Sequence, residues 1–370
     1  MTFWLVLFAV GMIVLVLSFI FIIKAVGRFS FVKRIAKENR KKKILVSAGI
    51  VLITVALLGF IFNIINAAMI VIHLLLIWII CDGVNLILKK CLKKEPKYYY
   101  AGIAAVCITI VYMSVGWYYA HHVYETHYDL KVNKDLNGKT LKVVQISDSH
   151  VGTVFDADKF MEYIEDINKL EPDIVLFTGD FIDDDTFKDD MVKSCKALGS
   201  LKTTYGVYYS FGNHDKGYYS AERRGYTVDD FYNEMRKNNI NILEDESVLI
   251  DDSFYIIGRR DGYISDRKKI KELVEGLDES KTMIVMDHEP MEYDEHADAK
   301  VDLVLSGHTH GGQFFPVIHL GEWLKMNCRT YGYEKRDNTN FIVSSGIADW
   351  EIKFKTGCIS EYNVITISQE

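Results

Sequence analysis

Four long apolar stretches fill the first third of the chain. Residues 3–23 contain no charged side chain, and further apolar runs cover about 44–63, 67–88 and 100–120. A helix of about 20 apolar residues spans a hydrocarbon layer of roughly 30 Å. One such run could be a helix in a soluble core, but four in succession favour a membrane region. We therefore expect residues 1–120 to form a membrane anchor with four transmembrane helices.

The loops between these stretches differ in charge, and this difference orients them. Residues 24–43 hold nine Lys and Arg against one Glu, and residues 89–97 hold five Lys against one Glu. The turn between them, Asn63 to Asn66, holds no charge. Because basic loops stay in the cytoplasm, we expect the chain beyond the fourth span on the extracytoplasmic side of the cell membrane. The basic loops would meet anionic membrane lipid, and no nucleic acid partner is expected.

After the fourth stretch, short apolar runs alternate with segments of helical spacing. Residues 121–140 are polar and are expected to be a connector. The runs that predict strands are 142–147, 173–180, 207–215, 282–290, 302–312, 341–346 and 363–367, with a hairpin over 241–259 and helices near 160–170, 228–238 and 265–276. Apolar strands separated by helices are typical of a largely parallel or mixed sheet that is covered on both faces. Residues 141–370 are therefore expected to form one large α/β domain.

Composition sharpens this division. The 370 residues are 49% hydrophobic with a net charge of −7, which excludes a disordered chain, and six Cys exclude a disulfide-stapled miniprotein. The net charge is +11 over residues 1–100 and −18 over residues 101–370. An acidic domain does not attract anionic substrates over a long range, so capture of a phosphate group would depend on bound metal ions.

Polar clusters directly follow five of the predicted strands. They are D-S-H with Asp148 and His150, G-D-F-I-D with Asp180, G-N-H-D with Asn213 and His214, His288 after IVMD, and G-H-T-H-G-G with His308 and His310. Because loops at the carboxyl ends of strands form the site in such folds, we expect one sheet edge to bring all five together. Gly179, Gly212 and Gly307 precede three of these clusters, as expected where the backbone turns tightly or approaches a ligand closely.

These residue types indicate a site for divalent metal ions. Carboxylate, imidazole and amide ligands suit Mn, Fe or Zn, and the lack of nearby Cys argues against a structural zinc site. A D-x-H or G-D-x-x-D motif alone is more often a turn or a helix cap, whereas G-H-T-H-G-G is specific, and all five in order favour a metal site. Two such ions can hold both the attacking and the leaving oxygen of a phosphate ester.

The order of these motifs resembles the calcineurin-like metallophosphoesterase superfamily from about Leu141 to the C-terminus. The continuation G-H-T-H-G-G-Q with Phe314, Phe315 and Pro316 is similar to a bacterial membrane-associated branch of phosphodiesterase-type enzymes. The resemblance implies a four-layer α-β-β-α sandwich that holds two metal ions, with a bridging hydroxide that attacks phosphorus.

The resemblance also implies a role for each matching residue. One metal ion would be held by Asp148, His150, Asp180 and His310, and the other by Asp180, Asn213, His288 and His308. His214 would protonate the leaving oxygen or stabilise the developing charge. Asp183 and Asp215 would orient the ligands.

The sequence departs from this branch near its end. Ser345 stands where the branch commonly has Arg, and Lys353 to Ile359 lacks the usual Arg-containing close, so we expect substrate recognition to differ. A disulfide between Cys328 and Cys358 is left open.

The sequence thus predicts a membrane-anchored, metal-dependent phosphodiesterase or pyrophosphatase, with phospholipid or lipid-linked envelope intermediates as substrates. A phosphomonoesterase and a metal-binding sensor or scaffold without turnover are the alternatives. A transporter is disfavoured, because His73 and Asp82 are among the few ionisable groups in the spans.

Overall fold

The computed structural model describes residues 2–37, 39–93, 96–134, 136, 138–263 and 266–369. These residues form two compact units, each of which is considered by itself. The first comprises Met1–Trp117 and Ile352–Phe354, and the second comprises Tyr118–Glu351 and Lys355–Glu370. We call them the helical unit and the α/β unit.

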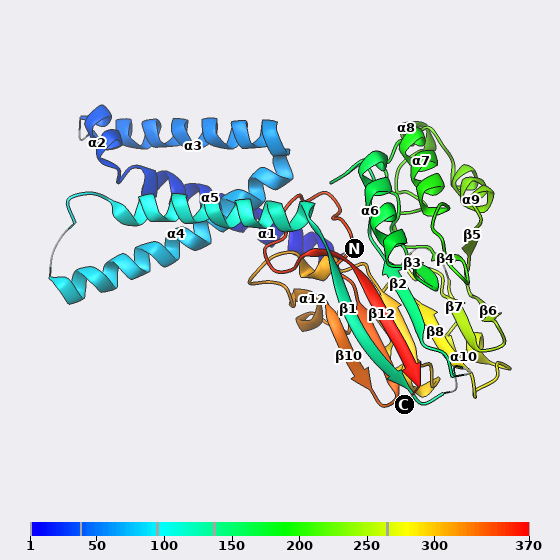
Figure 1. The fold of residues 1–370 in the computed structure, drawn as a ribbon. Coiled ribbons are helices and arrows are strands. Elements are labelled where there is room, and N and C mark those ends of the chain that lie inside the picture. Colours follow the sequence, from blue (N-terminus) through cyan, green and yellow to red (C-terminus); the bar gives the residue numbers. More distant parts are fainter. Residues whose placement is uncertain are drawn as a thin grey trace. The chain divides into compact units, whose positions relative to one another are not determined.

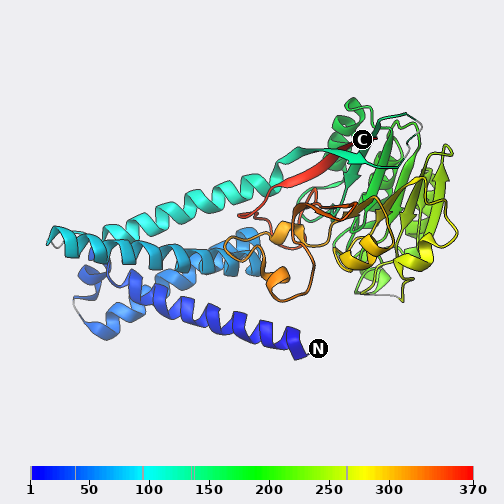
Figure 2. The ribbon, with the colours of Figure 1, turned by 90° about the horizontal axis from the view of Figure 1, so that it is seen from below.

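Four long helices and one short helix build the helical unit. They are α1 (Thr2–Val26), α2 (Ser30–Ala36), α3 (Arg40–Phe62), α4 (Ile64–Leu92) and α5 (Tyr100–His121). Helices α1, α3 and α4 run alongside one another (Figures 1 and 2). The four long helices are each long and apolar enough to cross a membrane, which agrees with the four predicted spans and indicates a membrane protein.

The outward faces of these helices are apolar. Leu45, Phe60 and Leu86 are 73%, 90% and 66% exposed. Such a surface is unfavourable in water, because each large apolar side chain loses about 1.5–3 kcal/mol when it is left exposed. A hydrocarbon environment removes this cost, so the exposed apolar surface agrees with the composition of the spans.

Asp82 is paired rather than free within the helical unit. Its carboxylate lies 2.7 Å from an Arg28 guanidinium nitrogen and accepts a hydrogen bond from the Tyr99 hydroxyl at 2.7 Å. Arg28 belongs to the first basic loop, so this ion pair places Asp82 next to that loop. The Nδ1 atom of His73 lies 2.8 Å from the Met69 carbonyl oxygen one helical turn earlier. Both groups therefore have contacts within the bundle.

Two six-stranded sheets make up the centre of the α/β unit. The first has the order β1-β12-β2-β3-β4-β5 and the second the order β10-β11-β9-β8-β7-β6. The strands of the first sheet are β1 (Val123–Val132), β12 (Ser360–Gln369), β2 (Leu141–Ile146), β3 (Ile174–Thr178), β4 (Val207–Ser210) and β5 (Ile240–Ile242). Those of the second are β10 (Gly332–Arg336), β11 (Thr339–Val343), β9 (Leu303–Ser306), β8 (Thr282–Met286), β7 (Phe254–Gly258) and β6 (Glu246–Ile250).

Alternate residues of the central strands enter different apolar cores. In β3, Leu176 faces a core shared with the second sheet, whereas Val175 and Phe177 face a core shared with helices. Side chains alternate across a strand, so a strand that is covered on both faces needs a continuous apolar run. This requirement explains the uninterrupted apolar runs from which the strands were predicted.

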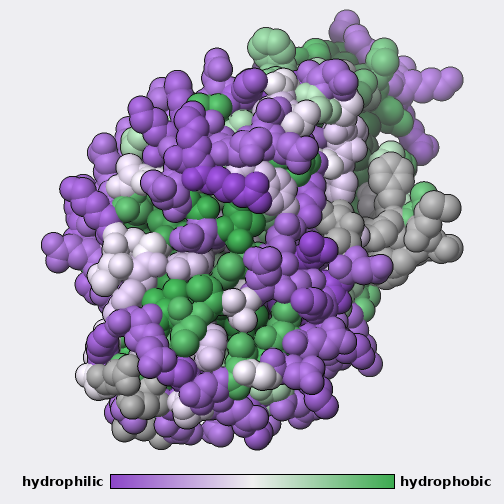
Figure 3. Space-filling view, turned by 90° about the vertical axis from the view of Figure 1, so that its right-hand side faces the viewer, coloured by the Kyte–Doolittle hydropathy of each residue, from purple (hydrophilic) through white to green (hydrophobic). Residues whose placement is uncertain are grey.

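Helices cover the outer face of each sheet and complete the layers. The first sheet packs against α6 (Ala157–Lys169), α7 (Lys188–Leu198) and α9 (Val228–Lys237), and the second against α10 (Ile270–Val274) and α11 (Tyr293–Asp298). The predicted four-layer α-β-β-α sandwich is thus confirmed. Figure 3 shows one side of the α/β unit, where hydrophilic side chains predominate, in contrast to the outward faces of the long helices.

The predicted connector over residues 121–140 is wrong for half of its length. Val123–Val132 forms strand β1, which pairs in parallel with all ten residues of β12, and the two lie side by side in Figure 1. The segment has the polar composition of a connector, with Glu125, His127 and Asp129 on alternate positions. An edge strand tolerates such residues, since one of its faces remains open to solvent.

The predicted hairpin over 241–259 is confirmed for residues 246–258, but its first residues belong to another strand. Strands β6 and β7 pair antiparallel, but β5 pairs with β4 in the first sheet. The chain therefore crosses from one sheet to the other between Ile242 and Glu246. An apolar run does not reveal such a change of sheet, because both strands bury side chains in the same way.

The core between the sheets makes a testable prediction. Leu305 on β9 is fully buried there, and Leu249 on β6 is 40% exposed. We expect Leu305→Ala to destabilise the α/β unit by about 3 kcal/mol, because it leaves a cavity. The same change at Leu249 should cost less than about 1 kcal/mol. Thermal unfolding of the detergent-solubilised chain should show a loss of roughly 6–12 °C for the first variant only. Equal losses for both would contradict this core.

Candidate metal centre

The predicted site residues all lie in loops at the carboxyl ends of strands. The first sheet contributes Asp148 and His150 after β2, Asp180 after β3, and Asn213 and His214 after β4. The second sheet contributes His288 after β8, and His308 and His310 after β9. The expectation of one sheet edge is therefore wrong, because two sheets packed face to face present their loops at the same end.

Six of these side chains form two groups of three that could each hold a metal ion. One group is Asp148, His150 and His310, and the other is Asp180, His288 and His308, with one potential ligand atom per residue and all atoms of a group within 4.8 Å of one another. Asn213 Oδ1 lies 2.8 Å from His308 Nδ1, which places this amide beside the second group. The backbone N–H of His214 donates to Asp180 Oδ1 at 2.8 Å. All eight predicted residues are thus brought together.

Asp180 lies between the two groups. Its Oδ2 atom is 3.1 Å from His288 Nε2 in its own group and 3.7 Å from His150 Nε2 in the other. A carboxylate in this position can bind two cations at once, and paired ions about 3.5–4 Å apart are typical of sites that act on phosphate esters.

The imidazoles of His150 and His288 are oriented as metal-ligating histidines usually are. Their Nδ1 atoms contact protein oxygens, Asp183 Oδ2 at 3.2 Å and the Thr178 carbonyl oxygen at 2.7 Å. Their Nε2 atoms are buried and lie near Asp180 Oδ2, at 3.7 Å for His150 and 3.1 Å for His288. A buried carboxylate and imidazole nitrogens that converge in this way are the environment that a cation would complete. The donor set therefore fits a divalent metal ion.

Five of the candidate ligands have a backbone conformation that non-glycine residues seldom adopt. The φ angles are 52° for Asp148, 35° for His150, 54° for Asp180, 69° for His308 and 48° for His310. Each such residue stores on the order of 1–3 kcal/mol of strain, and strain of this kind concentrates at functional sites. The loops therefore place the candidate ligands at the cost of strained backbone angles.

The Asp215 carboxylate holds the strained loop that carries Asp180. It accepts hydrogen bonds from the backbone N–H groups of Asp180, Phe181, Ile182 and Gly212 at 2.7–3.2 Å. A side chain at Gly212 would collide with the Asp180 carboxylate, and one at Gly307 would collide with Asp148. These two glycines therefore permit the close approach that the sequence indicated, and Asp215 offsets part of the backbone strain.

Without metal ions, protons take part in the charge balance of the centre. Burial lowers the pKa of His150, but the hydrogen bond to Asp183 and the charge of Asp180 outweigh it and raise this pKa to about 9. Burial also opposes protonation of His288, yet the charges of Asp180 and Asp148 raise its pKa well above the usual range. Burial and the charge of His288 lower the pKa of His308 to about 3.

Metal binding should consequently release protons. At pH 7 the metal-free centre holds protons on His150 and His288, because both pKa values are raised, and a cation must displace them. We expect about two protons to be released when the centre fills with Mn²⁺ at pH 7, and the affinity to rise with pH across the neutral range. Calorimetric titration in buffers of different ionisation enthalpy measures this number.

A variant at Asp183 provides the control. Asp183→Asn removes the carboxylate that raises the pKa of His150, so proton release should fall by up to about one. A wild-type affinity that does not change between pH 6 and pH 8 would contradict this charge balance.

Two buried residues near the centre were not found by the sequence reasoning. Lys355 is fully buried, its Nζ donates to the Ser345 carbonyl oxygen at 2.6 Å, and it lies 3.3 Å from Asp349 Oδ1. That carboxylate oxygen is 3.6 Å from His310 Nδ1. Lys355 and Asp349 therefore support a candidate ligand. The only feature of the sequence that pointed to this segment was its departure, over residues 353–359, from the family branch that it resembles. The sequence alone does not show that a lysine is buried.

The Ser345 hydroxyl is internal as well. It donates to the Ile359 carbonyl oxygen at 2.5 Å, and the residue is fully buried. Cys358 is buried and Cys328 is exposed, and both are free thiols, so the disulfide that the sequence left open is absent.

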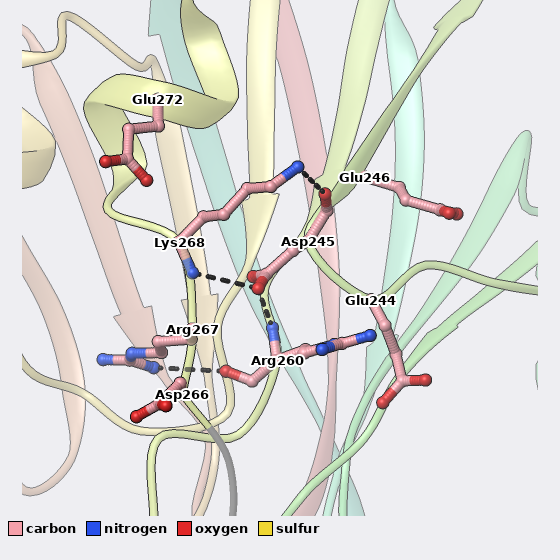
Figure 4. Close-up of a pocket in the computed structure, with 8 residues that line it drawn as sticks. All are labelled: Glu244, Asp245, Glu246, Arg260, Asp266, Arg267, Lys268 and Glu272. Atoms are coloured by element: carbon pink, nitrogen blue, oxygen red, sulfur yellow. Dashed lines mark hydrogen bonds between the residues drawn. The ribbon is translucent and has the colours of Figure 1, made fainter.

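A charged pocket of about 480 Å³ contains none of the predicted residues (Figure 4). It is lined by Glu244, Asp245, Glu246, Arg260, Asp266, Arg267, Lys268 and Glu272. The Asp245 carboxylate accepts hydrogen bonds from the backbone N–H of Arg260 at 3.1 Å and of Lys268 at 2.9 Å. Figure 4 shows this carboxylate between the two chain segments, so it fixes the base of the loop that follows β7.

Comparison with known proteins gives this geometry a family. Residues 141–312 match the family model described as calcineurin-like phosphoesterase. An uncharacterized metallophosphoesterase of Helicobacter pylori is 33% identical over 226 residues, which cover 59% of this chain and 57% of that protein. A transmembrane protein with metallophosphoesterase domain from Bos taurus is 27% identical over 240 residues, 60% of this chain and 52% of that protein. A solved dimetal phosphatase from Danio rerio aligns with a TM-score of 0.37 at 11% identity, over 56% of this chain and 87% of that one.

The chain carries a calcineurin-like phosphoesterase domain, of the class of the metallophosphoesterases. It spans little more than half the length of the curated relatives that it matches. The resemblance seen in the motifs is thereby confirmed for the domain.

Proposed function

We propose that this chain is a membrane-anchored phosphohydrolase that uses two divalent metal ions, Mn, Fe or Zn, to cleave a phosphodiester or a pyrophosphate. The supporting observation is the pair of ligand groups with Asp180 between them. In this proposal one ion is held by Asp148, His150, Asp180 and His310, and the other by Asp180, Asn213, His288 and His308.

In this proposal the metal ions and the protein residues have different roles in the reaction. When bound, two such ions supply an activated water and neutralise the charge that develops on the phosphoryl oxygens. Asp180 is held in place for both by the N–H of His214 and by the loop contacts of Asp215. The part-exposed ring of His214 is placed to donate a proton or a hydrogen bond to the leaving oxygen. Burial lowers the pKa of His214 and so favours the neutral ring near pH 7, the form that donates a hydrogen bond to the leaving oxygen rather than a proton.

A phosphomonoesterase would use the same centre, and the two reactions differ in the charge of the substrate. With Mn²⁺ added, we expect a higher kcat/KM for bis-(p-nitrophenyl) phosphate than for p-nitrophenyl phosphate. Asp180→Asn should lower kcat by at least about 100-fold, because it removes the shared charge from both ions. Asp185→Asn makes the same change on a half-exposed carboxylate of the same loop and should retain activity.

Other results of these assays would support an alternative function or contradict the ligand assignment. A higher kcat/KM for the monoester would favour the phosphomonoesterase. Metal binding without turnover of either ester would favour a sensor or scaffold. An active Asp180→Asn variant would contradict the assignment of the ligands.

The proposed orientation follows from the basic loops. All 14 Lys and Arg of residues 1–117 lie within residues 24–43 and 89–97, at the ends of α1, α3 and α4 and in the segments between the helices. Because such loops stay in the cytoplasm, the α/β unit would lie on the extracytoplasmic side. The metal centre would then be anchored on the extracytoplasmic side of the membrane that the helices span. For this reason we propose phospholipid or lipid-linked phosphate esters as the substrates. Membrane lipids are the proposed partners, and nucleic acid is not.

Two exposed cysteines allow a direct test of this orientation. Cys328 lies in the α/β unit and Cys91 near the cytoplasmic end of α4, and both are exposed. In single-cysteine variants on intact cells, a membrane-impermeant maleimide should label Cys328 but label Cys91 only after lysis. The reverse pattern would invert the topology.

A further inference from the structure

Three half-exposed aromatic side chains lie against imidazoles of the candidate centre. The ring of Tyr218 is 5.0 Å from that of His214, and the ring of Trp350 is 4.9 Å from the same imidazole. The ring of Tyr263 stacks on His308 at 5.2 Å with an interplanar angle of 26°. Exposed fractions are 55% for Tyr218, 53% for Tyr263 and 47% for Trp350.

The three aromatics come from separate loops, after β4, β7 and β11. Large aromatic side chains usually bury most of their surface, so three that remain half exposed around one centre form an apolar rim.

A buried carboxylate holds the Tyr218 loop, and another holds the Tyr263 loop. Asp184 accepts hydrogen bonds from the N–H groups of Tyr218 at 2.8 Å and Tyr219 at 3.1 Å. Glu289 accepts from the N–H groups of Gly262 and Tyr263 at 3.1 and 3.2 Å. Asp184 and Glu289 are 8% and 2% exposed. The backbone at Tyr218 and Tyr263 is therefore held by internal hydrogen bonds.

Contacts of the two residues before Trp350 hold the start of its loop. Asp349 is fully buried and lies 3.3 Å from the Lys355 ammonium group. The Ala348 N–H donates to the Asp148 carbonyl oxygen at 3.1 Å, which ties the start of this loop to the centre. The Tyr218 hydroxyl also accepts a hydrogen bond from Asn213 Nδ2 at 2.7 Å. All three aromatics are thus joined to the ligand loops.

The basic side chains beside these aromatics are already used by the protein. Arg224 is 3% exposed and donates to the Lys216 carbonyl oxygen at 3.3 Å. Arg267 donates to Asp287 and Glu289 at 2.8 and 2.7 Å, and Lys355 to backbone carbonyl oxygens. These cations are committed to internal oxygens, so they do not provide a clamp for a highly charged phosphate group.

We infer that Tyr218, Tyr263 and Trp350 form a subsite for a flat or apolar ester group of a phosphodiester with a single negative charge. This inference rests on the proposed phosphohydrolase function and narrows its substrate class. The metal ions would meet the charged phosphoryl group, and the aromatic faces would pack against the uncharged ester group. A flat ring, such as a nucleobase, and an apolar chain, such as that of a phospholipid, share this chemistry.

The test compares two diesters that have the same leaving group. Bis-(p-nitrophenyl) phosphate carries a second aryl ring, and methyl p-nitrophenyl phosphate carries a methyl group in its place. The ratio of their kcat/KM values, measured on the Mn²⁺-loaded full chain in detergent, reports the subsite. A loss of folding or of metal lowers both rates alike and leaves this ratio unchanged.

We expect Trp350→Ala and Tyr263→Ala each to lower the ratio by about tenfold, mainly through KM of the aryl diester. Trp350→Phe should restore most of it, because a flat ring is retained. Tyr219→Ala is the matched control, since Tyr219 is 66% exposed next to Tyr218 but its ring lies against Arg223. That variant should keep the wild-type ratio.

Inhibition then identifies the source of the ester group. Competition by adenosine monophosphate that is relieved in Trp350→Ala indicates a flat ring, and the same pattern with phosphatidylglycerol in mixed micelles indicates an apolar chain. Turnover of both diesters with an unchanged ratio in Trp350→Ala and Tyr263→Ala overturns the subsite and leaves the phosphohydrolase intact. A wild-type chain that binds Mn²⁺ and hydrolyses neither diester overturns the proposed function and the subsite together.

Discussion

The structure of the α/β unit depends on one cluster of buried carboxylates and imidazoles, the candidate metal centre. Asp148 and Asp180 are 0% and 1% exposed, and the imidazoles of His150 and His288 lie beside them with no access to water. Carboxylates in such surroundings cost several kcal/mol each unless cations and hydrogen bonds compensate them. The N–H groups of His308 and His214 supply part of that compensation. Protons on the imidazoles can compensate more of the carboxylate charge, and divalent cations can replace those protons. The buried carboxylates therefore require positive charge beside them, either protons or metal ions.

The remainder of the unit provides rigidity for this centre. The two sheets end in short loops, and several candidate ligands in these loops have left-handed backbone angles. Strain of this kind persists only where the surroundings outweigh it. Buried carboxylates with no ligand role do so by accepting backbone N–H groups: Asp215 holds the loop after β3, and Asp184 and Glu289 hold the loops that carry Tyr218 and Tyr263. The acidity of the unit is therefore in part internal.

This arrangement also explains why some basic residues near the centre pair with internal oxygens. Lys355 and Arg267 are attached to carbonyl and carboxylate oxygens of neighbouring loops. A buried cation in such a position balances the carboxylates that orient the ligands. The charge of a bound phosphate group would then be met by metal ions, and the outer rim of the centre remains aromatic.

The amino-acid pattern by itself determined the four apolar helices, the apolar strands and the polar clusters after them, because burial on both faces and hydrocarbon length each demand a particular local pattern. The motif resemblance supplied the grouping of Asp148, His150 and His310 apart from Asp180, His288 and His308. The tertiary structure alone decided that two sheets share the site, that polar residues 123–132 form an edge strand, and that Lys355 and Asp349 lie inside. These features arise from contacts between segments far apart in the chain. The local sequence pattern does not specify which distant segment a residue contacts.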